Sequence, residues 1–266
     1  MTDFPSPSEF EHVLFIGGPP GVGKTTVASI LARRHGLRLF SADTRTWVHR
    51  DRAVAAGIEA AIRWESLSRE ERLAAPNDEL VAMSLYRDRG AMVMDDLRSL
   101  PRSPVTVAEG TVIRPVDVPP GASAIWLLSD ASDQRQRLVG RDGQALRLYQ
   151  VMLDVITAEV AEAGVAVIKM DSIAETVAAV ENFFAAQLGR GPLAATAAER
   201  RQLLREANLD VVNQVRGYYA RPWAVGDPEA VVRSFICECG NPECQSFVEA
   251  SVADADRGPV ILTGDA

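Results

Sequence analysis

One glycine-rich stretch near the start of the chain has residue types and spacing that suit phosphate binding. It matches G-x-x-x-x-G-K-[ST] and consists of Gly18, Pro19, Pro20, Gly21, Val22, Gly23, Lys24 and Thr25, followed by Thr26. Glycines let main-chain N–H groups turn inward around phosphates, and a helix beginning at the lysine directs its positive end at them. Lys24 would reach the β- and γ-phosphates, and the Thr25 hydroxyl would ligate Mg²⁺. The alternative is a chance glycine-rich turn, but the apolar run before the stretch and the helix-forming residues after it predict an ATP·Mg²⁺ site.

Three carboxylates follow apolar runs that are typical of strands. Ligands of an open parallel sheet gather beyond the carboxyl ends of its strands. Asp43 is predicted to take the proton of an acceptor hydroxyl or to orient it, and the alternative is a cap on the next helix. Glu109 is predicted to contact Mg²⁺ through water or to orient substrate, and the alternative is an ordinary loop carboxylate. Asp171 either lines an adenine pocket or caps the helix that begins near Ile173.

Three arginines follow the fourth apolar run, in the segment SDQRQRLVGRDG. They are Arg135, Arg137 and Arg141. Arginines on such a segment can close over a triphosphate and stabilise charge on the transferring group. A solvated charged face is the alternative. We expect Arg135 to bind nucleotide, and Arg137 or Arg141 to act in catalysis.

A second basic cluster comes directly after Asp43 and contains an aromatic residue. Its members are Arg45, Trp47, His49, Arg50 and Arg52. The cluster suits an anionic or ring-bearing acceptor, and it equally suits a surface helix.

All three cysteines lie close together, in the sequence CECGNPEC. Cys237, Cys239 and Cys244 have C-x-C-x₄-C spacing, which in a reducing compartment favours zinc thiolates over a disulfide. The Gly-Asn-Pro between them can form a tight turn. A redox role or inert packing is the alternative. Structural zinc takes four ligands, so one ligand is missing from this cluster.

Five apolar runs are expected to form the strands that position these residues. They are His12–Gly18, Leu37–Asp43, Val105–Thr111, Ser123–Asp130 and Val165–Asp171. Helical stretches alternate with them, which is typical of a parallel α/β sheet covered on both faces.

The remaining segments predict two additions to this sheet. Residues 44–104 have helical periodicity and are expected to form a helical insertion over the carboxyl edge of the sheet. After a helix over Ile173–Leu188, Gly189–Thr196 forms a plausible linker to a further helix that stops before Pro222. We therefore expect a P-loop domain over residues 1–190 and a small cysteine-bearing module over residues 197–266.

Charge and hydropathy narrow the function classes. The net charge of -8 argues against a nucleic-acid partner, which favours a basic surface. No apolar run approaches the ~18–20 residues of a membrane span, and no signal pattern precedes the first strand. A cytoplasmic protein is expected, and its oligomeric state is left open. Lys24 and Lys169 are the only lysines, and a lysine in an arginine-rich chain is more often there for its chemistry.

The sequence resembles the small P-loop kinases grouped with chloramphenicol phosphotransferase, zeta toxins and shikimate kinase. The resemblance covers roughly residues 10–188 and rests on GGPPGVGKTT, the Asp that closes SAD, the strand VTVAEGT and the arginine-bearing segment. It implies a five-stranded parallel sheet in the order 2-3-1-4-5, ATP·Mg²⁺ as donor and a hydroxyl acceptor. By this resemblance Asp43 is the acceptor-side base, Glu109 the carboxylate of the third strand, and Arg135 to Arg141 the lid. The long insertion departs from those kinases, so the acceptor is unassigned.

The C-terminal segment resembles cysteine-rich segments joined to such domains in bacterial ATP-binding proteins. Similar modules often close with Gly-His, and the matching residues here are Gly264-Asp265. The resemblance therefore implies Asp265 as a fourth zinc ligand, with Glu243 or a ligand from another subunit as alternatives.

Together these residues predict an ATP-dependent phosphotransferase that moves the γ-phosphoryl group of MgATP to a hydroxyl of a small molecule. The alternative is an ATP-binding regulatory protein in which nucleotide occupancy switches the partner contacts of the C-terminal module.

Overall fold

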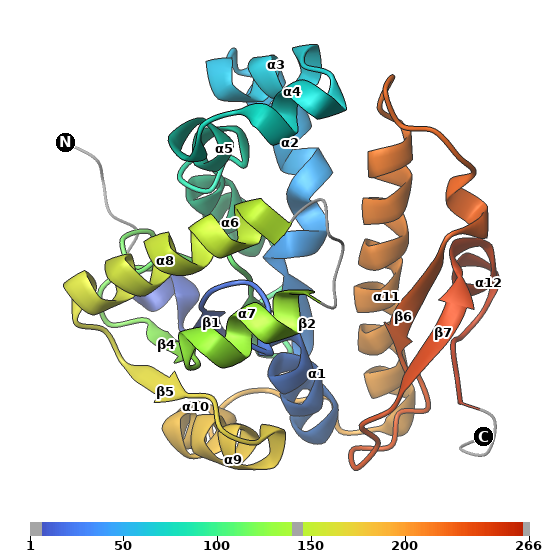
Figure 1. The fold of residues 1–266 in the computed structure, drawn as a ribbon. Coiled ribbons are helices and arrows are strands. Elements are labelled where there is room, and N and C mark those ends of the chain that lie inside the picture. The colour runs from blue at the N-terminus through green and yellow to red at the C-terminus, as the bar shows by residue number, and fades with distance from the viewer. Residues whose placement is uncertain (1–6, 140–145, 263–266) are drawn as a thin grey trace.

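A five-stranded parallel sheet organises the computed structural model, which describes residues 7–139 and 146–262 (Figure 1). The strands are β1 (Val13–Gly17), β2 (Arg38–Ser41), β3 (Thr106–Glu109), β4 (Ser123–Leu128) and β5 (Val167–Lys169). Their order is β2-β3-β1-β4-β5, and every neighbouring pair is parallel. The central strand β1 has the sequence VLFIG and is buried along its whole length, as expected for a parallel strand covered on both faces. The predicted fold class and strand order are confirmed.

Helices cover the two faces of the sheet. On one face lie α1 (Lys24–His35), α9 (Ile173–Phe183) and α10 (Ala185–Leu188), and their apolar side chains pack with alternate residues of β1 such as Leu14 and Ile16. The other face is covered by α6 (Arg89–Ser99) and α8 (Leu146–Ala163), which pack around Val13 and Phe15. The helix predicted over Ile173–Leu188 is interrupted at Phe184, so α9 and α10 are separate helices.

The segment between β2 and β3 is helical, as predicted. A short 3₁₀ turn, η2 (Ala42–Arg45), leads into α2 (Thr46–Ala55), α3 (Glu59–Ser66), α4 (Arg69–Ala74), α5 (Asn77–Met83) and then α6. Ser68 caps α4 because its hydroxyl accepts a hydrogen bond from the Glu71 N–H, and the Ser68 N–H donates to Glu71 Oε2, which completes a capping box. The last helix of the segment returns to the sheet, because Val93, Met94 and Leu97 of α6 lie in its core.

The C-terminal segment stands beside the sheet, next to β2 and α1 (Figure 1). It contains α11 (Ala197–Tyr219), η3 (Pro228–Ala230), the antiparallel strands β6 (Val232–Ile236) and β7 (Phe247–Ser251), and α12 (Val252–Arg257). Thr196 and Glu199 form a capping box that starts α11. Residues 211–260 contribute a small core of their own around Val212, Phe235 and Val252.

The segment also shares the core of the sheet domain. Leu204, Ala207 and Ile236 pack into the cluster that contains α1 and β1. The connecting residues 189–196 are tied to that domain, since the Ala194 N–H donates to Gly36 O and the Val105 N–H donates to Pro192 O. None of the helices in the described ranges is long and apolar enough to cross a membrane.

Candidate functional site

The glycine-rich loop joins the end of β1 to α1, as the sequence predicts. Gly18 and Gly23 have φ values of 134° and 99°, which side-chain-bearing residues rarely adopt. A Cβ atom at Gly18 would lie 2.3 Å from Leu127 O, and one at Gly23 would lie 2.7 Å from Met170 Cε. Glycine is therefore required at both positions, and the loop main chain is held in the shape that turns N–H groups inward.

Lys24 lies across this loop and is only 5% exposed. Its Nζ donates to Pro19 O at 3.0 Å and to Thr111 Oγ1 at 3.4 Å. The ammonium group is thus fixed between the loop and the residue that comes two positions after the end of β3.

Glu109 ends β3 and is fully buried beside Thr25. Its Oε1 accepts hydrogen bonds from Thr25 Oγ1 at 3.2 Å and from Ser41 Oγ at 2.5 Å, while Oε2 has no hydrogen-bond partner among the described residues. Burial and the nearby Asp43 charge raise the pKa of Glu109 to about 7, although Lys24 opposes the shift. An unsatisfied buried carboxylate oxygen next to a threonine hydroxyl fits a hard divalent cation such as Mg²⁺.

Asp43 lies beside Lys24 and Glu109 rather than capping a helix. Its carboxylate accepts from the Thr111 N–H at 3.3 Å and from Thr111 Oγ1 at 3.2 Å. The residues preceding η2 and α2 make no side-chain cap, so the alternative role of Asp43 as a helix cap is wrong. The strand register brings Asp43 close to Glu109. Ser41 of β2 pairs with Glu109 of β3, and Asp43 comes two residues after Ser41.

Arg89 supports the group formed by Asp43 and Glu109, which we call the acidic corner. It was not identified from the sequence. It is 5% exposed, its Nη2 donates to Ala42 O, and its Nε donates to His49 Nδ1 at 3.2 Å. His49 Nε2 therefore carries the hydrogen and donates to Asp96 Oδ2 at 2.9 Å. Burial lowers the pKa of Arg89, and the charges of Asp43 and Asp96 oppose this shift. In an arginine-rich sequence nothing distinguishes this arginine from a surface one.

The helix α7 (Ala131–Val139) rests on the phosphate loop through residues that the sequence did not single out. Gln134 is buried and its Nε2 donates to Pro20 O at 2.5 Å, while Leu138 packs against Gly21. Arg135 and Arg137 are exposed on this helix, and Arg135 pairs with Asp154 at 3.2 Å. Arg141 lies outside the described residues. The glutamine four residues after Asp130 gives no sequence signal because its contact is with main chain from a distant element.

The segment after β5 approaches the loop through Met170 rather than through Asp171. Met170 Cε and Ile173 Cδ1 are the atoms nearest to Gly23. Asp171 is exposed, and the residue that caps α9 is Ser172, whose side chain accepts from the Glu175 N–H. The alternative role of Asp171 as the cap of this helix is therefore wrong.

The basic cluster after Asp43 is neutralised within the protein. Arg45 pairs with Asp210 at 2.8 Å, and Arg52 pairs with Asp96 at 2.8 Å. Arg50 is buried, donates to Met83 O and lies 4.7 Å from the centroid of the Trp64 ring. These contacts favour a helix packed within the protein. That is neither the site for an anionic acceptor nor the surface helix that the sequence suits, since His49 and Arg50 are buried.

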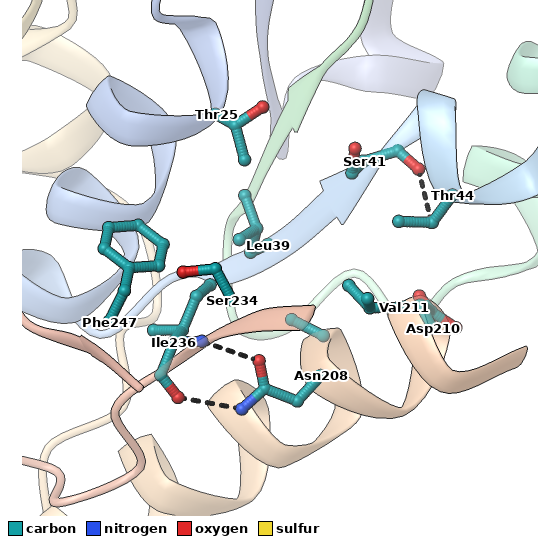
Figure 2. A pocket seen from close by; sticks show the side chains of 11 residues that line it. Thr25, Leu39, Ser41, Thr44, Asn208, Asp210, Val211, Ser234, Ile236 and Phe247 are labelled. Atoms are coloured by element: carbon teal, nitrogen blue, oxygen red, sulfur yellow. Dashed lines mark hydrogen bonds between the residues drawn. The ribbon is translucent and has the colours of Figure 1, made fainter. Parts of the chain in front are cut away.

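Two cavities lie in the described part of the molecule, and one of them borders the site at Thr25 and Ser41. The smaller one, of about 70 Å³, separates Thr25 and β2 from the C-terminal segment (Figure 2). There, Asn208 of α11 fixes β6, because its Nδ2 donates to Ile236 O at 2.8 Å and its Oδ1 accepts from the Ile236 N–H at 2.9 Å. The larger one, of about 470 Å³, lies between α5 and α8 and is lined by Asn77, Asp78, Val81, Ala82, Arg87, Asp88, Val151 and Val155.

The three cysteines converge as a metal site requires. Cys237, Cys239 and Cys244 are buried, and their Sγ atoms all lie within 4.8 Å of one another. Gly240 turns the chain between them with φ of 76°. Among the described residues no further His, Cys, Asp or Glu side chain joins this group. Glu243 is exposed outside it, and Asp265 lies outside the described residues.

Two of these thiols differ in acidity. Burial raises the pKa of Cys239 to about 11, and hydrogen bonding with the other two thiols adds to the shift. Burial also disfavours the Cys244 thiolate, but the Ser246 N–H and the Arg33 charge outweigh it and lower the pKa of Cys244. Of these two thiols, Cys244 therefore forms its thiolate more readily than Cys239.

The comparison with known proteins agrees with this geometry. A family model described as an AAA domain matches residues 14–147, which is half of the chain and includes the phosphate loop, the insertion and the strand that ends at Glu109. No curated protein matches the chain significantly.

Proposed function

The chain belongs to the AAA-domain family of P-loop proteins, and from this premise we propose that it is an ATP-dependent phosphotransferase acting on a hydroxyl of a small molecule. The proposal goes beyond nucleotide binding because the site holds two carboxylates with separate surroundings. Glu109 faces the metal-binding threonine, and Asp43 faces Thr111.

The observation that carries the proposal is the bridge made by Thr111. Its hydroxyl lies 3.4 Å from Lys24 Nζ and donates to Asp43 Oδ2 at 3.2 Å. A phosphate-binding cation and a potential general base are thereby held on either side of one side chain. A phosphoryl group bound at Lys24 would lie within reach of an acceptor hydroxyl at Asp43, which is the arrangement that in-line transfer needs.

In the proposed reaction the acceptor hydroxyl oxygen attacks the γ-phosphorus as the bond from that phosphorus to the bridging oxygen of ADP breaks. The hydroxyl proton passes to the Asp43 carboxylate, and the negative charge of the leaving ADP is stabilised at Lys24 and the loop N–H groups. Asp43 fits this task because its carboxylate is held by a main-chain N–H and a hydroxyl, with no arginine paired to it among the described residues.

Thr25 and Glu109 are the residues that would hold Mg²⁺. Thr25 would offer its hydroxyl as a ligand, and Glu109 would orient it and accept from metal-bound water. The ion would neutralise charge on the β- and γ-phosphates. Its positive charge would also compensate the buried Glu109 carboxylate, whose Oε2 lacks a partner in the part of the chain that the structure describes.

We place the acceptor between Asp43 and the helical insertion. The cavity of about 470 Å³ between α5 and α8 has the volume of a small-molecule site, with valine side chains as its walls and Arg87 and two aspartates as polar groups. Its link to Asp43 runs through the start of α6, because Arg87 of the cavity is two residues from Arg89, which contacts Ala42 next to Asp43. The lid roles of Arg137 and Arg141, and nucleotide contacts of Arg135 and Asp171, remain predictions.

We also propose that Cys237, Cys239 and Cys244 bind zinc. Three buried Sγ atoms within 4.8 Å of one another match a structural thiolate site that lacks one ligand, for which Asp265 is the proposed candidate. Free thiols and ATP-dependent chemistry suit a reducing compartment, so a cytoplasmic location is part of the proposal.

The second candidate function is an ATP-binding regulatory protein, and one contact favours it. Gln214 of α11 donates to Asp43 O at 2.9 Å, so the C-terminal segment contacts the acidic corner directly. Nucleotide occupancy could then be transmitted to α11 without any transfer chemistry.

The two candidates differ in turnover. Purified protein is incubated with MgATP and a pool of small metabolites from a cell extract, and ADP formation is followed with and without the pool. A phosphotransferase forms ADP in proportion to the pool that is added. Tight ATP binding with no pool-dependent ADP formation would favour the regulatory protein.

A further inference from the structure

A buried arginine near the cysteines has no acidic partner among the residues that the structure describes. Arg33, in the last turns of α1, is 1% exposed. Within residues 7–139 and 146–262, no carboxylate lies within 4.0 Å of its guanidinium, in contrast to its neighbour Arg34, which pairs with Glu181 at 2.8 Å. A buried charge without a counter-ion is strongly destabilising, so the surroundings of Arg33 must supply negative charge or strong dipoles.

The Arg33 guanidinium is directed at the cysteine loop. Its Nη1 donates to Cys244 O at 2.8 Å and to Ser246 O at 3.1 Å, and lies 3.6 Å from Cys244 Sγ. Its Nε and Nη2 have no acceptor among the described residues. The Phe247 ring covers the group, with the ring centroid 5.4 Å from Cζ. Two carbonyl dipoles alone therefore leave most of this cation unsatisfied.

The charge that a loaded cysteine site would carry is of the right sign. Three thiolates around one divalent ion have a net charge of about -1, and binding releases the three thiol protons. With three neutral thiols the loop would offer Arg33 no charge at all. Arg200 and Arg201 of α11 also donate to the loop, to Gly240 O at 3.2 Å and to Cys239 O at 3.0 Å, so the cluster is set among cations.

We propose that Arg33 is the counter-cation of a metal–thiolate centre formed by Cys237, Cys239 and Cys244, and that it raises the affinity of this centre for zinc. The inference rests on the zinc site proposed above. It also assigns a role to α1, which begins at Lys24 of the phosphate loop and ends in the turns that hold Arg33. One helix then connects the nucleotide site with the metal centre.

The test separates the charge of Arg33 from its hydrogen bonds. Arg33→Gln keeps an N–H donor for the loop carbonyls but removes the positive charge. Arg33→Lys keeps the positive charge but removes the planar guanidinium group with its several N–H donors. Arg34→Gln is the matched control on the same turn. Zinc affinity is measured by competition with a chromogenic chelator. Outer-shell partners of metal ligands typically change affinity by roughly 10- to 100-fold, and we expect a loss of this order in Arg33→Gln, a smaller loss in Arg33→Lys and none in Arg34→Gln.

Thermal unfolding gives a second measurement on the same proteins. Zinc removal should lower the unfolding temperature of the wild-type protein more than that of Arg33→Gln, because weaker binding stabilises the native state less. Arg33→Met replaces Arg33→Gln if circular dichroism shows that the glutamine variant is unfolded. Equal zinc affinity in the wild-type protein and the neutral variant would overturn the role of Arg33 and leave the zinc site intact. Wild-type protein that binds no zinc would overturn both.

Discussion

The acidic corner, with the phosphate loop beside it, and the cysteine loop (residues 237–244) bring their functional groups together in opposite ways. At the corner, Thr25, Ser41 and Glu109 come from three separate elements, and strand register brings them to one point. In the loop, all three thiols come from one short segment of the sequence, from Cys237 to Cys244. The corner therefore depends on the whole sheet, whereas the loop needs only local spacing to assemble its sulfur atoms. The loop still relies on distant residues, Arg33 and Arg201, to fix its main chain.

The two regions also differ in the sign of the added charge that would stabilise them. At the corner, burial and the Asp43 charge raise the pKa of Glu109 to about 7, so the site favours a cation. Around the cysteines, buried Arg33 lacks an acidic partner within the described ranges, so that site favours a negatively charged centre. A divalent ion would serve both sites, bound with its phosphate ligands at one and with thiolates at the other.

The largest effect on turnover is expected from Asp43→Asn. The amide cannot take a proton, so turnover should fall by roughly 10²- to 10⁴-fold, the range for loss of a general base. ATP affinity should change little, because the carboxylate faces the acceptor side. Steady-state kinetics and ATP titration measure the two quantities, with the exposed Asp95→Asn as control. A collapse of ATP affinity with unchanged turnover per bound ATP would assign Asp43 to the nucleotide or to the fold.

Glu109→Gln should give a smaller defect that depends on Mg²⁺. The amide still accepts from Thr25 but no longer attracts the ion, so we expect a loss of about 10- to 100-fold, as for outer-shell metal partners. Raising the Mg²⁺ concentration should restore part of the activity. A defect that is the same at every Mg²⁺ concentration would remove the metal role of Glu109.

Cys239→Ser should act on the other region and spare the corner. It removes one of the three thiolates, so bound zinc should be lost and residues 230–262 should become more sensitive to limited proteolysis. ATP affinity should be nearly unchanged, because Lys24 contacts Pro19 and Thr111, and Glu109 contacts Thr25 and Ser41, which all lie in the sheet domain. Metal analysis by mass spectrometry measures the zinc content, and ATP titration measures the ATP affinity. Unaltered zinc content in this variant would contradict the proposed ligand set.

The smallest effect is a pH-dependent change in stability at Glu109. Its pKa is raised in the folded protein, so the stability due to its protonated form is present below pH 4.5 and is lost as the pH rises through about 7. Without added Mg²⁺, Glu109→Gln should therefore be more stable than the wild-type protein at pH 8, by about 1–3 kcal/mol, and similar to it at pH 5. Urea unfolding at the two pH values measures this difference, with the exposed Glu70→Gln as control. A difference that is the same at both pH values would show that Glu109 does not titrate in this range.

The sequence predicted the parts of the site that follow from strand ends and from local motifs. The phosphate loop, the convergence of Asp43 with Glu109 and the cysteine cluster are of this kind, because a parallel sheet aligns its carboxyl ends and a turn gathers its own thiols. The strand order followed only from the resemblance to small P-loop kinases, and the structure confirms it. Residues that act through distant main-chain atoms were missed. Gln134 contacts Pro20 O, Arg89 contacts Ala42 O, and Arg33 contacts Cys244 O, and no local pattern signals such pairs.

The arginines show most clearly where sequence reasoning ends. Position after the fourth apolar run and the resemblance to a lid drew attention to Arg135 and Arg137, which are exposed, and passed over Arg33 and Arg89, which are buried. The difference lies in burial and in the identity of the partner, and both are set by tertiary packing. In a chain whose basic residues are nearly all arginine, the type carries little information about position.

The proposal of a phosphotransferase is tested most directly by transfer from labelled ATP. ATP carrying ¹⁸O in its γ-phosphoryl group is mixed with wild-type protein and a small-molecule extract, and the products are analysed by mass spectrometry. The account predicts a metabolite that gains the labelled phosphoryl group together with an equal amount of ADP. Lys24→Ala should reduce this product by roughly 10²-fold or more with the fold preserved, and Glu70→Gln should not. A labelled product formed equally well by Lys24→Ala, or label recovered only as inorganic phosphate, would contradict the account.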